Sequence, residues 1–464
     1  MRQKNTGASM IKMTLSQIAE NLNGTLIGAD AEISGVSIDT RTLQTGNLYI
    51  AITGKNFDGH DFVDSAKAAG AMAILTHKKL ETDLSQVLVK NTHSALSELA
   101  KKWREKMPAK IVGVTGSNGK TTTKEMLATI LNMNNNVLFT QGNLNNDIGV
   151  PLTLLKLSPE NRFAVIEMGA NHIGEIAYTS RLANADVVVI TNVGAAHLEG
   201  FGDLNGVAKT KGEIIETLNE NGVAVLNRDD TFFDYWQNLA GSQKIITFGL
   251  HENSDIRAEN IVVKIENHQF ITRFDLICAD GKISVNLPLA GNHNVLNALA
   301  ATAATSALGI TLKQIKQGLE SMSSVKGRLQ LLHGHKGSTI INDTYNANTA
   351  SLQAALNVLQ KCEGEHWVIL GAFGELGDDT EKLHFEMGET LKNSGVKRLF
   401  AVGELTKKTV AAFGENAAHF ATQSELLNSV TPLLMGNETI LIKGSRSQRM
   451  ENVTAALTEF TGIH

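Results

Sequence analysis

The sequence predicts an α/β protein of three domains that is built largely on parallel sheets. Strand-like and helical segments alternate along most of the 464 residues, a pattern typical of a parallel sheet covered by helices. The alternation restarts near residue 338, which indicates a separate doubly wound, Rossmann-like domain. Residues 244–288 interrupt it with β-rich runs, so we expect an antiparallel section in the central domain.

The elements follow in three groups along the chain. In the first region, short strands at 48–52 and 72–75 alternate with short helical patterns. The second region has buried strand patterns at 111–114, 163–168, 187–193 and 223–227, and a long helix that starts near His293. The third region has strand patterns at 339–341, 367–370, 399–402 and 439–442. Apolar runs bounded by turn residues carry each of these assignments.

These groups set the expected domain limits. We expect a small N-terminal domain at 10–95, a central domain at 96–325 and a C-terminal domain at 326–464. Residues 1–9 are polar and patternless, so they are a tag or a disordered end. The sequence Lys326-Gly327-Arg328 is a candidate hinge between the second and third domains.

Composition narrows the class of protein. A net charge of −5 without a basic stripe argues against nucleic acid as a partner. No apolar run is long enough to cross a bilayer, and no signal-peptide pattern precedes the first helix, so we expect a cytoplasmic protein. Cys278 and Cys362 lie far apart without metal-site spacing, which fits a reducing compartment. A monomer is the default expectation.

A glycine-rich loop between a strand and a helix is the clearest functional signal. An apolar run at 111–114 leads to Gly116-Ser117-Asn118-Gly119, followed by Lys120, Thr121, Thr122 and a helical pattern. Backbone N–H groups of such a loop cradle phosphate oxygens, and the helix N-terminus adds partial positive charge. Lys120 is positioned for the β- and γ-phosphates, and the hydroxyl of Thr121 for Mg²⁺. Val114 replaces the first glycine of the strict motif, but the flanking strand and helix argue against a simple glycine turn.

Glu167 and His197 follow the next two strand patterns. Because ligands bind beyond the carboxyl ends of the strands in doubly wound sheets, both side chains are expected near the phosphate loop. A carboxylate and an imidazole there suit Mg²⁺ or a bound water. A structural cap is the alternative for each residue taken alone. Lys211 lies on the apolar face of the helix at 203–218, and the pattern alone favours an amine that reaches solvent.

These motifs resemble the Mur ligases of peptidoglycan synthesis over nearly the whole chain after Met10. The stretch Thr115–Thr122 is similar to the ATP loop of the family, which explains the departure at Val114. The resemblance implies that Glu167 and His197 are metal-site residues together with Thr121. It also implies that Lys211 is carbamylated and becomes an anionic Mg²⁺ ligand.

Further motifs extend the resemblance to the nucleotide. Asn294 and Asn297, in Leu289-Ala-Gly-Asn-His-Asn294 and just after it, are similar to the adenine-side motif of the family. Arg328 matches the arginine that reaches the triphosphate from the third domain, and Asp343 matches the residue that meets the ribose. The implied catalytic residues are Lys120, His197, Lys211 and Arg328.

Other segments resemble the branch of the family that adds a dipeptide. They are Gly142–Pro151, with Asn143, Asn145 and Asn146; Asp343–Asn348, with Tyr345, Asn346 and Asn348; and Lys443–Glu451, with Lys443 and Arg446. Ser37 and Arg41 belong to a motif of the UDP-binding domain that other branches share. The chain departs from its relatives at Asp147, Thr349 and Ala372, and the last of these bears on the dipeptide site.

The resemblance implies an ATP- and Mg²⁺-dependent ligase. ATP would phosphorylate the terminal carboxylate of UDP-MurNAc-tripeptide, and the amine of D-Ala-D-Ala would attack the acyl phosphate. Two alternatives stay open: another ligase of the superfamily, such as an amino-acid-adding Mur ligase or a folylpolyglutamate synthetase, and a non-catalytic nucleotide switch. Dipeptide-dependent phosphate release distinguishes among the three.

Overall fold

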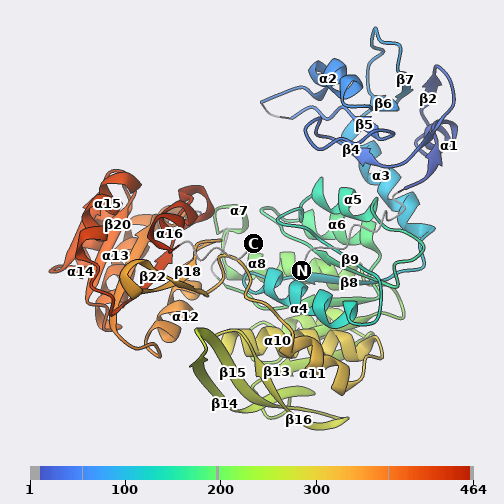
Figure 1. Ribbon diagram of the computed structural model, residues 1–464. Helices are drawn as coiled ribbons and strands as arrows, with labels where there is room; N and C mark the ends of the chain where they lie inside the picture. The colour runs from blue at the N-terminus through green and yellow to red at the C-terminus, as the bar shows by residue number, and fades with distance from the viewer. Residues whose placement is uncertain (1–10, 55, 195–197, 375, 460–464) are drawn as a thin grey trace.

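The computed structural model describes residues 11–54, 56–194, 198–374 and 376–459, which form three α/β parts along the chain (Figure 1). The expected tag or disordered end at 1–9 and the predicted catalytic residue His197 lie outside the described residues. No helix in the described ranges is long and apolar enough to cross a membrane.

The N-terminal part is a small sheet flanked by short helices. Its elements are β1 (Met13–Thr14), α1 (Leu15–Asn21), β2 (Thr25–Ile27), β3 (Glu32–Ile33), β4 (Val36–Ser37), β5 (Leu48–Ile50), the 3-10 helix η1 (Gly59–Phe62), α2 (Val63–Ala68), β6 (Ala73–Thr76) and β7 (Ser85–Leu88). Five strands are arranged in the order β2-β7-β6-β5-β4. All neighbours pair in parallel except the edge strand β2, which runs antiparallel to β7.

The central part contains a nine-stranded sheet. Its elements are α3 (Thr92–Glu105), β8 (Lys110–Thr115), α4 (Lys120–Asn132), β9 (Val137–Phe139), α5 (Gly149–Leu154), β10 (Phe163–Glu167), α6 (Glu175–Ala183), β11 (Val187–Ile190), α7 (Leu198–Phe201), α8 (Leu204–Glu216), β12 (Val223–Asn227), α9 (Phe233–Ala240), β13 (Lys244–Gly249), β14 (Ile256–Glu266), β15 (Gln269–Cys278), β16 (Gly281–Leu287), α10 (Asn292–Ala307) and α11 (Leu312–Glu320). The strand order is β16-β15-β14-β13-β12-β11-β8-β10-β9.

The antiparallel section is shorter than the sequence predicts. Strands β14, β15 and β16 pair antiparallel as expected. However, β13, which opens the predicted β-rich stretch, pairs in parallel with both β12 and β14 and so extends the parallel sheet. A hairpin is possible only where two strands run in opposite directions, and β13 is joined to β12 through the helix α9 instead.

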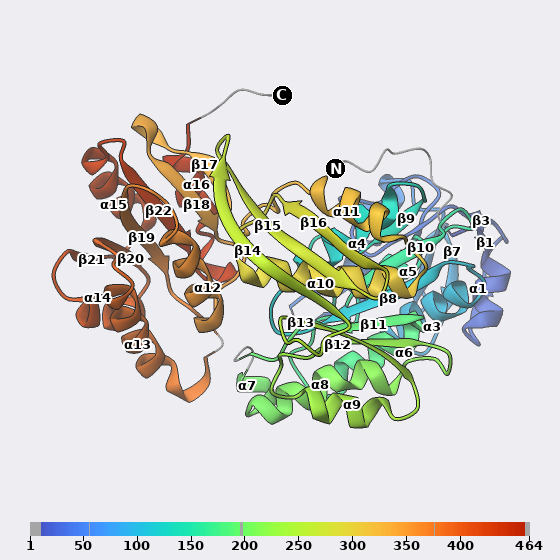
Figure 2. The ribbon, with the colours of Figure 1, turned by 90° about the horizontal axis from the view of Figure 1, so that it is seen from below.

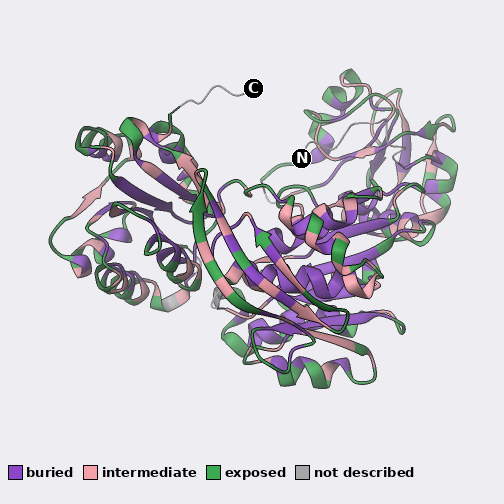
Figure 3. Ribbon diagram, turned by 60° about the horizontal axis from the view of Figure 1, so that its bottom comes forward, coloured by how far each residue is buried: buried purple, intermediate pink, exposed green. Residues whose placement is uncertain are grey.

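The central strands are buried on both faces, which accounts for their nearly unbroken apolar sequences (Figure 3). Successive side chains of β8 alternate between two cores. Ile111 packs in a core with α3, α5, α6, α8 and α9, whereas Val112 and Val114 pack with α4, α10 and α11. The carboxyl ends of β8, β10 and β11 therefore emerge between two layers of helices, at the edge where the phosphate loop begins.

The C-terminal part is a second doubly wound unit. Its elements are β17 (Gln330–His333), η2 (His335–Gly337), β18 (Thr339–Asp343), α12 (Thr349–Leu359), β19 (Glu365–Gly371), η3 (Gly377–Asp379), α13 (Thr380–Asn393), β20 (Arg398–Val402), α14 (Thr406–Phe413), β21 (Ala417–Phe420), α15 (Gln423–Val430), η4 (Thr431–Leu433), β22 (Glu438–Lys443), η5 (Arg446–Gln448) and α16 (Glu451–Leu457). The order is β17-β18-β22-β19-β20-β21, and only β17 runs antiparallel to its neighbour. Helices α12, α13 and α14 pack on one face, and α15 and α16 on the other.

The long hairpin β14–β15 extends from the central sheet to the C-terminal part and packs against it (Figure 2). Phe270, at its tip, is buried in the apolar core of the C-terminal part. The rings of His268 and His333 stack with their centroids 3.6 Å apart. The α/β fold class is thus confirmed, with a mostly parallel central sheet, an antiparallel section and a separate doubly wound unit. The exact domain limits stay a prediction.

Candidate active site

The loop between β8 and α4 needs glycine at two positions. Gly116 has φ +144° and Gly119 has φ +80°, backbone conformations that other residues rarely adopt. A Cβ atom at Gly116 would collide with the hydroxyl of Thr191, and one at Gly119 would collide with the side-chain oxygen of Asn297. The absence of side chains at these two positions therefore lets the loop lie close to the residue that follows β11 and to α10.

Gly119→Ala should weaken nucleotide binding by at least about tenfold, because the new methyl group must displace Asn297 as well as strain the backbone. The left-handed conformation alone costs about 1–2 kcal/mol. Gly309→Ala is the matched control, since Gly309 has φ +79° and nothing within 4 Å of the added Cβ. Titration calorimetry with ADP should detect the loss only in the first variant, and equal losses in both would contradict this account.

Lys120 begins α4 and folds back over the loop. Its amine donates hydrogen bonds to the carbonyl oxygens of Gly116 at 2.6 Å and Ser117 at 3.1 Å. The side chain is half-buried, but the amine itself lies deep, and this burial lowers the pKa of Lys120. Glu167 opposes the shift and the positive charge of Arg328 adds to it. A phosphate in the loop would offer this amine stronger, charged acceptors.

The segment after β11 holds the middle of the loop in place. The side-chain oxygen of Asn192 accepts a hydrogen bond from the backbone N–H of Asn118 at 3.0 Å. The hydroxyl of Ser117 accepts the N–H of Gly194 at 2.9 Å, and the hydroxyl of Thr191 donates to the carbonyl of Asn118 at 2.6 Å. The loop is therefore shaped before any ligand binds, which reduces the entropic cost of binding.

Thr121 and Glu167 come together beneath the loop, as predicted. The hydroxyl of Thr121 lies 3.4 Å from Oε1 of Glu167, which also accepts a 2.8 Å hydrogen bond from Asn145. The other carboxylate oxygen, Oε2, is buried and has no hydrogen-bond partner. The Lys124 amine lies 3.8 Å from this oxygen, beyond hydrogen-bond distance, so the oxygen can still bind a hard cation. Mg²⁺ fits, because it takes one or two protein oxygens and fills its other positions with water and phosphate.

Among the residues that the structure describes, no three His, Cys, Asp or Glu side chains form a cluster that could hold a metal alone. This does not count against Mg²⁺, because a threonine hydroxyl and one carboxylate are ordinary ligands when phosphates complete the shell. The predicted partner His197 lies outside the described ranges.

Lys124 supports the site carboxylate Glu167 from beside the cavity, and the sequence reasoning missed it. It is 1% exposed, and its amine donates to the carbonyl of Thr140 at 2.9 Å and lies 3.8 Å from Oε2 of Glu167. Glu125 gives it a second ion pair at 3.0 Å. The spacing could have predicted this position, because a lysine four residues after Lys120 lies on the same face of the helix.

Lys211 is buried at the predicted position on α8. It is 2% exposed, lines the cavity, and holds its amine 5.4 Å from the centre of the Phe201 ring. Burial, together with the nearby charge of Lys120, lowers the pKa of Lys211 to about 7, although Glu213 and Glu175 oppose the shift. The amine does not reach solvent, so the alternative favoured by the sequence pattern alone is wrong. The amine is buried because α8 packs against neighbouring helices.

Asn294 and Asn297 lie on the first turns of α10, next to the loop. The amide of Asn297 donates to the side-chain oxygen of Asn294 at 3.2 Å, and Asn294 in turn donates to the carbonyl of Ala290. His293, directly before Asn294, also lines the cavity. Burial lowers its pKa to about 4, with Lys443 and Arg328 adding to the shift and Asp343 opposing it. A neutral imidazole therefore faces the cavity, and sequence reasoning missed it.

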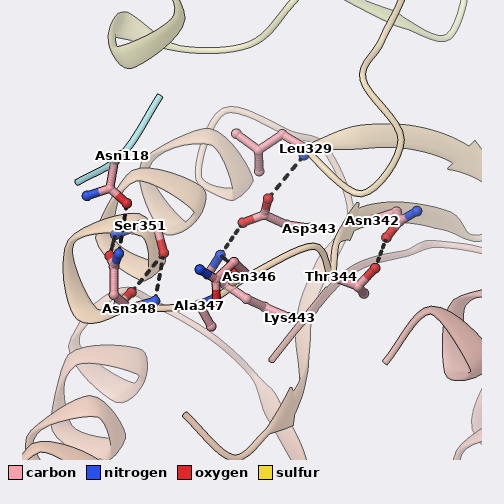
Figure 4. Close-up of polar contacts among 10 residues, drawn as sticks. All are labelled: Asn118, Leu329, Asn342, Asp343, Thr344, Asn346, Ala347, Asn348, Ser351 and Lys443. Atoms are coloured by element: carbon pink, nitrogen blue, oxygen red, sulfur yellow. Dashed lines mark hydrogen bonds and ion pairs between the residues drawn. The ribbon is translucent and has the colours of Figure 1, made fainter. Parts of the chain in front are cut away.

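Arg328 and Asp343 reach the site from the C-terminal part. One terminal nitrogen of Arg328 lies 3.4 Å from the hydroxyl of Thr121. Asp343 forms a buried ion pair with Lys443 at 2.5 Å and accepts the N–H of Leu329 at 3.2 Å (Figure 4). The Lys443 amine also donates to the carbonyl of Asn346. Burial lowers the pKa of Lys443, while Asp343 opposes this shift.

Asn348 links the two parts directly. Its side-chain oxygen caps α12 by accepting the N–H of Ser351 at 2.8 Å (Figure 4). Its amide donates to the side-chain oxygen of Asn118, in the phosphate loop, at 2.7 Å. Tyr345 and Asn346 line the same cavity, as does Arg446, which pairs with Glu451 at 3.0 Å.

The loop before α5, within the segment Gly142–Pro151, also faces this cavity. Asn143, Asn145 and Asn146 line it, and Asn146 accepts the N–H of Gly149. The neighbouring residue Asp147 pairs with His93, at the start of α3, at 2.9 Å. This contact ties the loop to α3, the helix that leads from the N-terminal part.

Ser37 and Arg41 are not in this cavity. Ser37 is buried at the end of β4, and its hydroxyl donates to the carbonyl of Asp39. Arg41 is almost fully exposed and pairs with Asp39 at 2.6 Å. The structure therefore places these two residues together in the N-terminal part, where the sequence predicts a separate UDP-binding region.

Apart from Gly116, which is not among the lining residues, and His197, which lies outside the described ranges, the predicted residues of the central and C-terminal parts converge on one cavity of about 820 Å³. Residues of both parts line it: Ser117, Asn118, Gly119, Lys120, Thr121, Thr122, Asn143, Asn145, Asn146, Glu167, Lys211, Asn294, Asn297, Arg328, Asp343, Tyr345, Asn346, Asn348, Lys443 and Arg446. A phosphate loop, one carboxylate for a metal and an arginine from a second domain together suit phosphoryl transfer, which depends on positioning and charge neutralisation.

Comparisons with protein families cover the chain in three segments. Residues 114–305 match the Mur ligase middle domain, and residues 327–446 match the Mur ligase glutamate ligase domain. Residues 32–105 match the Mur ligase family catalytic domain.

Individual relatives match this chain over nearly its full length. The chain is 46% identical to the UDP-N-acetylmuramoyl-tripeptide–D-alanyl-D-alanine ligase of Escherichia coli K12, covering 97% of this chain and 99% of that relative. A solved structure of MurF from Acinetobacter baumannii has a TM-score of 0.90 and 35% identity, covering 96% and 99% of the two chains. MurF of Thermotoga maritima in complex with ADP has a TM-score of 0.81 and 30% identity, covering 91% and 96%.

Proposed function

The chain belongs to the Mur ligase family, and from this premise we propose how its residues carry out the reaction. It is an ATP-dependent ligase of peptidoglycan synthesis that joins D-Ala-D-Ala to the peptide carboxylate of UDP-MurNAc-tripeptide. One observation carries the residue assignments. Arg328 and Asn348 of the C-terminal part contact Thr121 and Asn118 of the phosphate loop, so a nucleotide there would touch both domains.

The nucleotide is assigned to the cavity edge around the loop. We assign Gly116–Thr122 to the phosphates, and Lys120 and Arg328 neutralise the charge of the transferred phosphoryl group. Asn294 and Asn297 face the adenine. Asp343 accepts from the ribose hydroxyls, and its ion pair with Lys443 keeps its carboxylate in place.

Magnesium fits the donor groups of this cavity. Thr121 and Glu167 would hold one ion, and His197 with a carbamylated Lys211 would hold another. When bound, Mg²⁺ reduces the repulsion between the phosphates and the anionic carboxylate of the substrate. The lowered pKa of Lys211 supports the carbamate, because only a neutral amine reacts with CO₂.

The peptide substrates occupy the rest of the cavity. The terminal carboxylate of the tripeptide attacks the γ-phosphorus of ATP, ADP leaves, and an acyl phosphate forms. The amine of D-Ala-D-Ala then attacks the acyl carbon, inorganic phosphate leaves, and the amine loses a proton. Asn143, Asn145 and Asn146 bind the tripeptide side. Tyr345, Asn346, Asn348, Lys443 and Arg446 are assigned to the dipeptide side.

The remaining assignments are part of the same proposal. The N-terminal domain, residues 10–95, binds the UDP moiety through a surface that includes Ser37 and Arg41. The central domain, 96–325, binds ATP, and the C-terminal domain, 326–464, completes the active site. The enzyme works as a monomer in the cytoplasm, where ATP and nucleotide-linked precursors are available.

Phosphate release from ATP should depend on D-Ala-D-Ala when UDP-MurNAc-tripeptide is present. Without an acceptor amine the acyl phosphate accumulates and turnover stops after the first cycle, so the dipeptide should raise the steady rate by at least about 10²-fold. A coupled phosphate assay measures this rate, with free D-Ala as the control acceptor.

Two outcomes would contradict the proposed function. Efficient turnover with a free amino acid on a UDP-MurNAc-dipeptide, and none with D-Ala-D-Ala, would assign the chain to an amino-acid-adding ligase. Nucleotide binding without acceptor-dependent phosphate release under any of these conditions would favour a non-catalytic switch.

A further inference from the structure

The guanidinium of Arg328 lies on an aromatic ring. Its central carbon is 4.2 Å from the centre of the Tyr345 ring, well within the range of a cation–π contact. The Nε atom of Arg328 is buried and has no hydrogen-bond partner. Its terminal nitrogen reaches the hydroxyl of Thr121 only at 3.4 Å, which is long for a hydrogen bond. The ring is therefore the closest well-defined support of this side chain.

The backbone ties the two residues together as well. The N–H of Tyr345 donates to the carbonyl of Gly327 at 3.1 Å, and the N–H of Leu329 donates to Asp343 at 3.2 Å. The residues on either side of Arg328 in the chain are thus both hydrogen-bonded to the segment that carries Tyr345. Leu329 has φ +48°, an uncommon conformation for a branched side chain, and such strain persists only where surrounding contacts enforce it.

We propose that Tyr345 is a positioning residue for Arg328, acting through the face of its ring rather than through its hydroxyl. The ring holds the guanidinium toward Thr121, where the proposed function places the triphosphate, and so the inference rests on that assignment of Arg328. The geometry makes the ring and the arginine one unit that approaches the phosphate loop together with the C-terminal domain. Tyr345 therefore affects ATP binding through Arg328, in addition to its assignment to the dipeptide side.

Arg446 is a second cation near this ring, at 5.9 Å from its centre. Its guanidinium is paired with Glu451 at 3.0 Å and its side chain is mostly exposed. The shorter distance and the unpartnered Nε single out Arg328 as the arginine that depends on the ring.

A double-mutant cycle on nucleotide affinity tests the inference without the peptide substrates. Calorimetry with Mg²⁺ and ATPγS measures Kd for the wild type, Tyr345→Leu, Arg328→Ala and the double variant. We expect Tyr345→Leu to weaken binding about tenfold, or about 1.4 kcal/mol. In the Arg328→Ala background, the same change should alter Kd by less than about twofold, because the supported group is already absent.

The conservative variant separates ring from hydroxyl. Tyr345→Phe should restore most of the affinity that Tyr345→Leu loses. Equal losses in the Phe and Leu variants would assign the role to the hydroxyl, and independent, multiplying losses in the cycle would show that Tyr345 does not act through Arg328. Either result overturns the inference.

Phe385→Leu is the matched control. Phe385 is an aromatic residue of the same domain on α13, 45% exposed and outside the lining of the cavity. It should leave Kd unchanged, and thermal unfolding of each variant checks that the domain is intact. If the wild type binds ATPγS but shows no dipeptide-dependent phosphate release, the proposed acceptor fails while the cycle still decides the role of Tyr345.

Discussion

Lys120→Ala should lower turnover by about 10³-fold while the protein remains folded. The amine is the one cation at the start of α4 that reaches into the phosphate loop, where it lies 2.6 Å from the carbonyl of Gly116. Removing one preorganised donor from developing transition-state charge costs about 10²–10³-fold in rate. A full positive charge on a phosphoryl group falls at the upper end of that range.

The fold should tolerate this change because the charged amine contributes little to the free energy of folding. Its lowered pKa means that burial costs the charged form free energy, so losing the ammonium does not remove a net stabilising contact. Thermal unfolding should differ little from that of Lys101→Ala, an exposed lysine of α3 chosen as the control. A folded Lys120→Ala enzyme with near-normal phosphate release would contradict the phosphate-loop assignment.

Local sequence patterns predicted the nucleotide edge well because each part of it has a local cause. An apolar run forms β8, glycines are needed where the loop lies against Thr191 and Asn297, and a periodic pattern forms α4. Parallel strands end at one edge of the sheet, so Glu167 had to lie near the loop. None of these steps requires knowledge of the distant parts of the chain.

Long-range packing set the limits of that reasoning. The β-rich stretch 244–288 shows which residues form strands but not which neighbour each one pairs with, and β13 joined the parallel sheet. The burial of Lys211 depends on the helices around α8, and its own periodicity could not reveal them. The stacking of Arg328 on Tyr345 joins residues on either side of β17 and β18, and no spacing rule predicts it.

The resemblance supplied what the residue pattern could not. Periodicity alone favoured a lysine that reaches solvent, whereas the family motif implied a carbamate. The structure places the amine in a buried position that lines the cavity, with a pKa of about 7. A neutral amine is therefore available near physiological pH, and its fraction rises as the pH increases through 7.

Lys211→Ala should lose most activity, at least about 10²-fold, and added acetate or propionate should restore part of it. As an ammonium, Lys211 would repel Mg²⁺. As a carbamate it would supply an anionic oxygen, and a small carboxylate can occupy the space that the shortened side chain leaves. Coupled phosphate assays with and without the added carboxylate measure both effects.

Lys209→Ala provides the control, because Lys209 is exposed on the same helix and should be nearly normal with no response to acetate. Carbamylation has a separate readout. With ¹³C-labelled bicarbonate, the wild type should show a carbamate NMR signal that is absent in Lys211→Ala and grows as the pH rises from about 6 to 8, since the amine must lose its proton before it attacks CO₂. An active Lys211→Ala enzyme, together with no such signal in the wild type, would overturn the carbamate while leaving the phosphate loop and the dipeptide assignments intact.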